Sequence, residues 1–202
     1  IIMKKIISIL LCFLMIMPLS VTAYAQNNTL TDSLSAKSVV LMEMSSGEIL
    51  LSKNPDEKLP PASITKIMTM LLVMEALDSG KIKLDDIVTT SKNAASKGGS
   101  QIWLKEGEVM TVHELLKATV IASANDACTA LGEYISGDET SFVALMNKRA
   151  KELGMNNTCF ENCSGLNDTV TNHYSTARDV AIMSCELIKH ELIKEIINFR
   201  LN

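Results

Sequence analysis

One stretch of the sequence decides the fold, and it reads PPASITKIMT at residues 60–69. The two prolines, Pro60 and Pro61, end any preceding strand and permit a helix that starts just after them. Apolar residues then recur at helical spacing, at Ile64, Ile67, Met68, Leu71 and Leu72, while Met70, Val73 and Met74 occupy other faces. A helix that is apolar nearly all round is a buried one. The sequence therefore predicts a buried central helix that begins at Ser63 and ends near Gly80.

The residues before this helix predict a β-hairpin. Residues 37–44 and 48–52 are two apolar runs, and Ser45-Ser46-Gly47 between them has the composition of a turn. Because the runs are nearly continuous, we expect both faces of the strands to be covered.

The residues after the helix predict a mostly helical block. We expect helices that begin at Thr111, at Asp126, near Phe142 and after Ser175, the last one running to about His190. Thr111 and Glu114 have the spacing of a capping box, and Gly137 and Gly154 stop the second and third helices. Residues 81–110 are mixed, with Gly98-Gly99 as a loop. A hairpin followed by a helical block indicates an α/β chain of the α+β type.

The composition and the first residues indicate where the chain resides and which classes of partner it can have. The chain has a net charge of −4 and no basic stripe, which excludes nucleic acid as an expected partner. A basic start at residues 3–5, an apolar run over 6–21 and the small residues of Ala23-Tyr24-Ala25 predict a signal peptide at residues 1–25 and an exported chain. The alternative is an uncleaved membrane anchor, because the run reaches about the lower length limit of a spanning helix; Pro18 favours cleavage.

Several residues with possible chemistry receive a structural interpretation. The four cysteines after residue 25 permit disulfides without requiring them; they are Cys128, Cys159, Cys163 and Cys185. The spacing of Cys159 and Cys163 is a weak zinc pattern, so we expect buried or free thiols and no metal or cofactor. The histidines match no triad: we interpret His113 as solvent-facing and His173 as a loop residue. Trp103 is interpreted as packing and not as a platform for sugars.

Ser63 and Lys66 form the candidate catalytic pair. On a helix, residues three apart lie on one face, with their Cβ atoms about 5–6 Å apart, so Lys66 can reach the Ser63 hydroxyl. A serine hydroxyl needs a base to take its proton, and burial lowers the pKa of a lysine enough for it to serve as that base. The alternative is a helix cap with a solvated lysine, which the position at the start of a buried helix disfavours.

Ser123-Ala124-Asn125 is a second candidate element, in a short link between two predicted helices. A serine there can relay a proton, and an asparagine can bind a substrate amide as donor and acceptor. The alternative is a plain link between helices, capped by Asp126.

The two elements together resemble a known family. Residues 60–69 and the stretch IASANDA at 121–127 are similar to the first and second active-site motifs of the low-molecular-mass penicillin-binding proteins, the serine D-Ala-D-Ala carboxypeptidases of peptidase family S11. Further similar stretches are Gly99-Ser100 with the Leu104 segment, Phe142 through Gly154, and Ser175 through Asp179. The similarity runs from about Val39 to about His190. It implies a β-lactamase/transpeptidase-like fold in which this chain supplies an N-terminal hairpin and a helical subdomain.

The resemblance also implies roles and partners. Ser63 would attack the carbonyl between two D-alanines of a peptidoglycan stem peptide, and Lys66 would take its proton. Ser123 would pass a proton to the leaving D-alanine, and Asn125 would hold the peptide. β-Lactam antibiotics would acylate the same Ser63, without any metal or cofactor. The cell envelope, at the outer face of the cytoplasmic membrane or secreted, is the expected location.

Two departures from the family pattern bear on this expectation. No Lys-Thr-Gly motif occurs, although the family carries one on a strand after the helical region. We therefore expect residues 26–202 to be the N-terminal part of the catalytic domain, with an incomplete sheet and no activity when isolated. We also expect any membrane association to reside in a missing C-terminal segment.

The second departure is Ser164-Gly165-Leu166-Asn167, which stands where family members often have His-Gly-Leu-Asp. The alternatives are an inactive penicillin-binding fragment and a β-lactamase-like hydrolase; a class A enzyme would need a deacylating glutamate that is not found here.

Overall fold

The computed structural model describes residues 30–31, 33–166 and 171–199, so the predicted signal peptide and Asn167 lie outside the described residues. Within those ranges, no helix combines the length and the apolar character needed to cross a membrane. The elements, in chain order, are β1 (Val39–Met42), β2 (Ile49–Lys53), a 3₁₀ turn η1 (Ala62–Thr65), α3 (Lys66–Asp78), β3 (Ile87–Thr89), α4 (Lys92–Ala95), β4 (Val109–Thr111), α5 (Val112–Ala122), α6 (Asn125–Ser136), α7 (Glu139–Glu152), α8 (Ala177–Leu187) and α9 (Glu191–Phe199).

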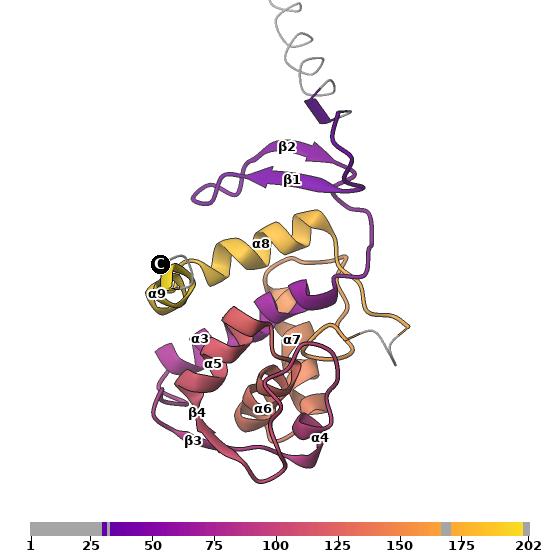
Figure 1. Cartoon of the computed structure of the whole chain (residues 1–202). Coiled ribbons are helices and arrows are strands. Elements are labelled where there is room, and N and C mark those ends of the chain that lie inside the picture. Colours follow the sequence, from indigo (N-terminus) through magenta and orange to yellow (C-terminus); the bar gives the residue numbers. More distant parts are fainter. Residues whose placement is uncertain (1–29, 32, 167–170, 200–202) are drawn as a thin grey trace, which may run out of the picture.

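The predicted central helix is confirmed as α3, which lies in the middle of the molecule (Figure 1). Its Met68, Leu71 and Val73 side chains are fully buried, and each contributes about 1.5–3 kcal/mol of hydrophobic stabilisation. Helices α6, α7 and α8 pack around it. The expected start at Ser63 is wrong in detail, because Ser63 lies in the tighter 3₁₀ turn and the α-helix begins at Lys66. Ile64, expected on the buried face, is 46% exposed because it belongs to that turn.

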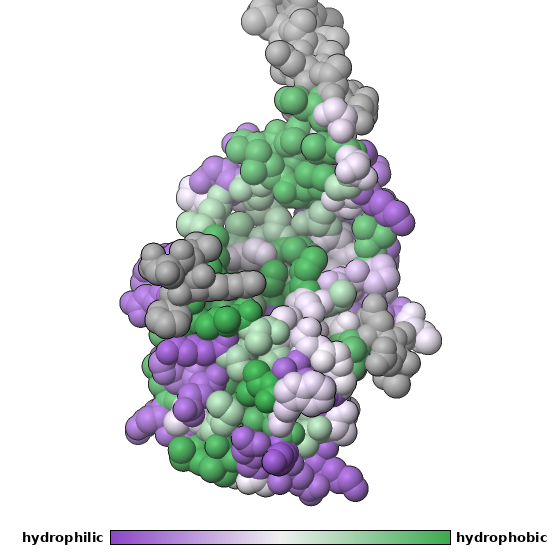
Figure 2. All heavy atoms as spheres, in the orientation of Figure 1, coloured by the Kyte–Doolittle hydropathy of each residue, from purple (hydrophilic) through white to green (hydrophobic). Residues whose placement is uncertain are grey.

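The predicted hairpin is confirmed, with β1 and β2 antiparallel and Leu41 opposite Leu51. The expectation that both of its faces are covered is wrong. Helix α8 lies against β1, whereas Leu41 and Leu50 are 53% and 49% exposed. An antiparallel pair can leave one face to solvent, and β1 and β2 form a two-stranded sheet in the described part of the chain. Figure 2 shows hydrophobic residues gathered over this hairpin.

The four helices predicted after α3 are confirmed as α5, α6, α7 and α8, although α8 ends at Leu187 rather than near His190 and α9 was not expected. Thr111 and Glu114 form the capping box of α5, with the Glu114 N–H donating to the Thr111 hydroxyl at 3.2 Å. Gly137 ends α6, and α7 stops two residues before Gly154. The cap of α8 is Thr176, not the expected Ser175, whose backbone instead pairs with Leu59. This difference matters for the site because the pairing fixes the chain in front of α8.

Two isolated β-bridges join distant segments beneath the hairpin. Leu59 pairs with Ser175, and Cys159 pairs with Tyr174. The first bridge attaches the segment before η1 to the segment before α8, and the second attaches that segment to the loop after α7. As a result, residues 59–66, 159–166 and 173–175 lie together.

The antiparallel pair β3–β4 was not expected from the sequence. Val88 lies opposite Met110, and Asp86 accepts a hydrogen bond from the Val112 N–H at 3.0 Å. Each strand has three residues, which is too short to display the alternation of polar and apolar residues that identifies a strand.

Candidate active site

Ser63 lies in the middle of η1, where the backbone turns sharply into the central helix. The residue before it, Ala62, has a φ of +46°, which an L-residue adopts only at an energetic cost. Ser63 is exposed, whereas Thr65 and Lys66 are buried. The turn therefore exposes the Ser63 hydroxyl to solvent, while the side chains of Thr65 and Lys66 are buried in the core.

Lys66 lies at the start of α3 with only 2% of its surface exposed. Its Nζ is 3.2 Å from Ser63 Oγ and donates to the Ser164 carbonyl at 2.9 Å. Burial lowers the pKa of Lys66 below its usual 10.5, although the nearby thiols of Cys128 and Cys163 act in the opposite direction. Because burial disfavours the charged form, a larger fraction of Lys66 is in the neutral amine form that a general base requires.

The cysteines around Lys66 are free thiols, as expected. Cys128 and Cys163 are fully buried, and the Cys128 thiol donates to the Cys163 carbonyl at 3.2 Å. Cys159 and Cys185 are free and partly buried. The thiols of Cys128 and Cys163 therefore pack in the buried surroundings of Lys66.

Asn125 lies in the same pocket as Ser63. This pocket has a volume of about 300 Å³ and is lined by Ala62, Ser63, Gly99, Ser100, Asn125, Gly165 and Leu166. Asn125 is the first residue of α6. Its amide nitrogen donates to the Gly98 carbonyl at 2.7 Å, and its backbone N–H donates to the Ser100 carbonyl, also at 2.7 Å. The side chain is thus held by the loop that forms the opposite wall of the pocket.

Ser123 is held less firmly than Asn125. It ends α5 in the left-handed conformation, with φ +54° and ψ +34°, and it is half-buried. Its hydroxyl forms no hydrogen bond within the described ranges, so the structure does not join it to Ser63 or Lys66. Its role as a proton relay stays a prediction.

Asp126, considered as a helix cap, has a different structural role. It is fully buried, and its carboxylate accepts hydrogen bonds from the backbone N–H groups of Ile102, at 3.1 Å, and Leu104, at 3.0 Å. Trp103, between them, has a φ of +66° and is 75% exposed. The interpretation of Trp103 as packing is therefore wrong, because the carboxylate binds the backbone on both sides and leaves the ring outside.

Gly165 makes the closest backbone approach in the site. Its φ is +80°, and a Cβ there would lie 1.8 Å from the Ala62 carbonyl oxygen and 2.7 Å from Thr65 Oγ1. Only glycine permits this contact. The loop of residues 163–166 therefore presses directly on the turn that carries Ser63, and its Ser164 carbonyl holds Lys66.

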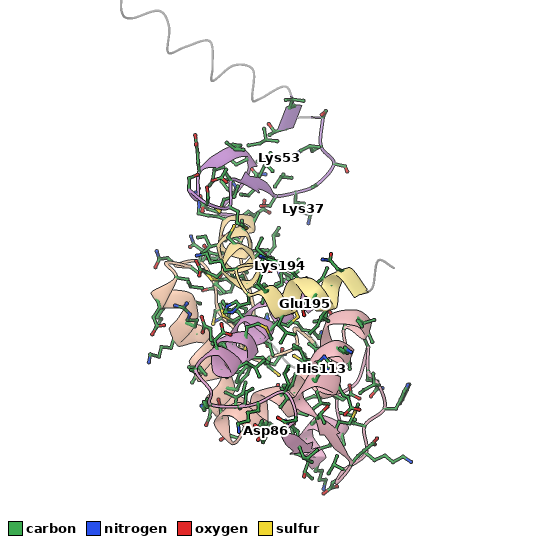
Figure 3. The ribbon with its side chains drawn as sticks, turned by 90° about the vertical axis from the view of Figure 1, so that its left-hand side faces the viewer. Lys37, Lys53, Asp86, His113, Lys194 and Glu195 are labelled. Atoms are coloured by element: carbon green, nitrogen blue, oxygen red, sulfur yellow. The ribbon has the colours of Figure 1, made fainter. Side chains whose placement is uncertain are left out.

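The loop position of His173 is confirmed, whereas the interpretation of His113 as solvent-facing is wrong. His173 does lie in a loop, but it is 6% exposed and its Nε2 is 2.7 Å from Thr65 Oγ1. No spacing in the sequence indicated it, because Thr65 and His173 are 108 residues apart. His113 is half-buried rather than solvent-facing, and it lines a hollow between α5 and α9 together with Glu195 (Figure 3).

Comparisons with known proteins place these features in a family. The profile of the D-alanyl-D-alanine carboxypeptidase family, peptidase S11, matches residues 23–200. The chain is 55% identical over 194 residues to D-alanyl-D-alanine carboxypeptidase DacF of Bacillus subtilis, covering 95% of this chain and 49% of that protein. The crystal structure of the carboxypeptidase DacD from Francisella tularensis matches with a TM-score of 0.78 and 38% identity, over 82% of this chain and 40% of that one.

A further similar structure contains a bound antibiotic. Penicillin-binding protein D2 from Listeria monocytogenes, in its ampicillin-bound form, matches with a TM-score of 0.71 and 31% identity, over 81% of this chain and 66% of that one. The chain spans about half the length of the curated relatives that it matches, 49% and 44% for the first two. The fold expected from the sequence is confirmed by these structures.

Proposed function

The chain belongs to the D-alanyl-D-alanine carboxypeptidase family, peptidase S11, and from this premise we propose that it carries the nucleophile of an enzyme that removes the terminal D-alanine from peptidoglycan stem peptides. One observation carries the proposal: the exposed Ser63 hydroxyl lies 3.2 Å from the buried nitrogen of Lys66. Ser63 lines the same pocket as Asn125.

Acylation begins with proton transfer from Ser63 to the neutral amine of Lys66. The Ser63 oxygen attacks the carbonyl carbon of the bond between the two D-alanines, and the tetrahedral intermediate then loses the amine of the terminal D-alanine. The proton taken by Lys66 passes to that amine, with Ser123 as the relay. The products are free D-alanine and an ester between Ser63 and the shortened peptide.

Deacylation returns the enzyme to its starting state. A water molecule gives up a proton and attacks the ester carbonyl, the shortened peptide leaves as a carboxylic acid, and Ser63 regains its proton. Asn125 holds the peptide through both steps, since a side-chain amide can both donate to and accept from a peptide group.

The remaining parts of the reaction belong to the larger protein. We propose that residues 26–202 are the N-terminal part of its catalytic domain. A Lys-Thr-Gly strand elsewhere in that protein would provide the cation for the substrate carboxylate and part of the oxyanion hole. Loss of one oxyanion donor can cost about 10²–10³ in rate, so we expect this chain alone to be inactive.

A β-lactam would acylate the same residue. The relative described with bound ampicillin supports this expectation, because a strained lactam carbonyl presents the same electrophile to Ser63. The basic, apolar and small-residue regions at positions 3–25 support export to the cell envelope.

Release of D-alanine tests the proposal. The full-length protein is incubated with a peptide that ends in D-Ala-D-Ala, and free D-alanine is measured for the wild type and for Ser63→Ala. We expect release by the wild type alone. Equal release by both proteins would overturn the assignment of Ser63.

A further inference from the structure

His173 forms a hydrogen bond through each of its ring nitrogens. The backbone N–H of Glu161 donates to Nδ1 at 3.0 Å, and a backbone N–H can only donate, so Nδ1 carries no proton. The proton of the neutral ring is therefore on Nε2, which donates to the Thr65 hydroxyl at 2.7 Å. The Phe160 ring packs edge-on against the imidazole, with ring centroids 5.8 Å apart. These contacts fix both the tautomer and the orientation of the ring.

Thr65, the residue that receives this hydrogen bond, lies between the nucleophile and its base. Its side chain is fully buried in η1. On one side it meets His173, and on the other it meets Gly165, where an added Cβ would lie 2.7 Å from Thr65 Oγ1. A shift of Thr65 would therefore move the turn that carries Ser63 relative to the loop that holds Lys66.

His173 also connects the two sides of this arrangement. Its Nε2 holds η1 through Thr65, and its Nδ1 holds Glu161, which lies two residues before the Cys163–Gly165 segment. That segment accepts hydrogen bonds from Lys66, at the Ser164 carbonyl, and from Thr69, at the Cys163 carbonyl. One imidazole thus bridges the turn with the nucleophile and the loop that orients the base.

We propose that His173 is a positioning residue for the proposed acylation: its neutral, Nε2-protonated ring keeps the Ser63 hydroxyl within reach of Lys66. The inference rests on the proposed function, but it concerns the acylation of Ser63 and not the identity of the natural substrate. His173 touches neither Ser63 nor Lys66 and acts through Thr65 and the loop.

Protonation of His173 breaks this arrangement. A second proton on Nδ1 would face the Glu161 N–H, so a donor would point at a donor and the loop would lose its hydrogen bond. Of the charged groups in the described ranges, the Glu161 carboxylate is the one that favours the protonated ring. This carboxylate is already bound by the N–H groups of Thr171 and Asn172. The burial of the ring has a larger effect than the Glu161 carboxylate and lowers the pKa of His173 below the usual 6.5. The functional neutral form is therefore lost only as pH falls below that lowered value.

The test compares acylation by a fluorescent penicillin among variants of the full-length protein. His173→Leu and Thr65→Val remove the hydrogen bond while keeping most of the volume, and we expect the second-order rate constant to fall by about 10-fold to 100-fold. His173→Gln can still donate to Thr65 but does not titrate, so most of the rate should return. His113→Gln, on α5, is the matched control and should leave the rate unchanged.

The pH profile distinguishes positioning from a general loss of packing. In the wild type, the logarithm of the acylation rate constant should decrease with a slope of one as the pH falls and Lys66 becomes protonated. Below the pKa of His173 it should decrease more steeply with pH. In His173→Gln the slope should stay at one. A steepening that persists in His173→Gln, or a folded His173→Leu with the wild-type rate, would overturn the proposal.

Two further outcomes separate this inference from the proposed function. A wild type that is acylated but releases no D-alanine would contradict the proposed substrate, while the His173 comparison would still decide the positioning role. If His173→Leu does not fold, the ¹⁵N chemical shifts of the wild-type imidazole decide: an Nε2–H tautomer at neutral pH is expected, and an Nδ1–H tautomer would overturn the inference.

Discussion

The Ser164 carbonyl accepts a hydrogen bond from the side-chain nitrogen of Lys66 at 2.9 Å, across 98 residues of sequence. This contact leaves Lys66 with its nitrogen turned toward Ser63 rather than toward solvent. The lysine is therefore oriented by a backbone atom of a loop and buried by the central helix, and neither feature depends on the identity of the Ser164 side chain. A different residue in place of the family's usual histidine is compatible with this contact.

Lys66→Arg should abolish acylation although the positive charge is kept. An arginine cannot give up its proton in a protein, so it cannot accept the proton of Ser63. If the neutral amine of Lys66 is the base, as proposed, acylation by the wild type should rise with pH to a plateau whose midpoint lies below 10.5, because burial lowers the pKa of Lys66. The rate of penicillin labelling across pH measures both effects. An active Lys66→Arg variant would place the base elsewhere.

Gly165→Ala should destabilise the protein by about 2–5 kcal/mol, because a positive φ and an overpacked contact each have a cost. The added Cβ would lie 1.8 Å from the Ala62 carbonyl oxygen, so the turn with Ser63 must shift and acylation should fall as well. Gly154→Ala is the matched control: its φ is +77°, but no atom lies within 4 Å of the added Cβ. Chemical denaturation of both variants checks this, and equal losses would contradict the close packing of Gly165 on η1.

Asp126→Ala should release the loop of residues 99–104 and reduce acylation. Its carboxylate binds the N–H groups of Ile102 and Leu104, and each buried donor left without a partner costs about 1–3 kcal/mol. Gly99 and Ser100 of this loop line the Ser63 pocket. Asp56→Ala is the control, because Asp56 pairs with Arg178 on the surface and should leave acylation unchanged. A rigid loop in Asp126→Ala, judged by unchanged Trp103 fluorescence, would contradict this account.

The local elements could be predicted from the sequence because their determinants are local. The 3.6-residue spacing of apolar side chains in α3 and the Thr111–Glu114 capping box both act within a few residues, and both were confirmed. The Ser63–Lys66 spacing likewise predicted a contact that the structure contains at 3.2 Å. The 3₁₀ geometry at Ser63 was not predictable, since it depends on Gly165 pressing against Ala62 from a distant loop.

The rest of the site depends on contacts between segments far apart in the chain. His173 reaches Thr65 only because Ser175 pairs with Leu59, and Tyr174 with Cys159. Trp103 is exposed because Asp126, on another element, binds the backbone on both sides of it. The exposed face of β1–β2 could not be predicted either, because a continuous apolar run does not reveal what covers it.

Ser123→Ala tests the relay assigned to this hydroxyl. If Ser123 passes the proton to the leaving D-alanine, its loss should lower D-alanine release by about 10²–10⁴-fold. The left-handed backbone at residue 123 tolerates alanine less well than glycine, so Ser123→Gly serves as the control for strain. Release by both variants at the wild-type rate would remove Ser123 from the mechanism.

The most direct test of the central claim is the mass of the adduct that ampicillin leaves on the full-length protein. After proteolysis, the account predicts one modified peptide, with the penicilloyl group esterified to Ser63, and no modified peptide in Ser63→Ala. An adduct on any other residue, or an undiminished adduct in Ser63→Ala, would contradict the assignment of Ser63 as the nucleophile.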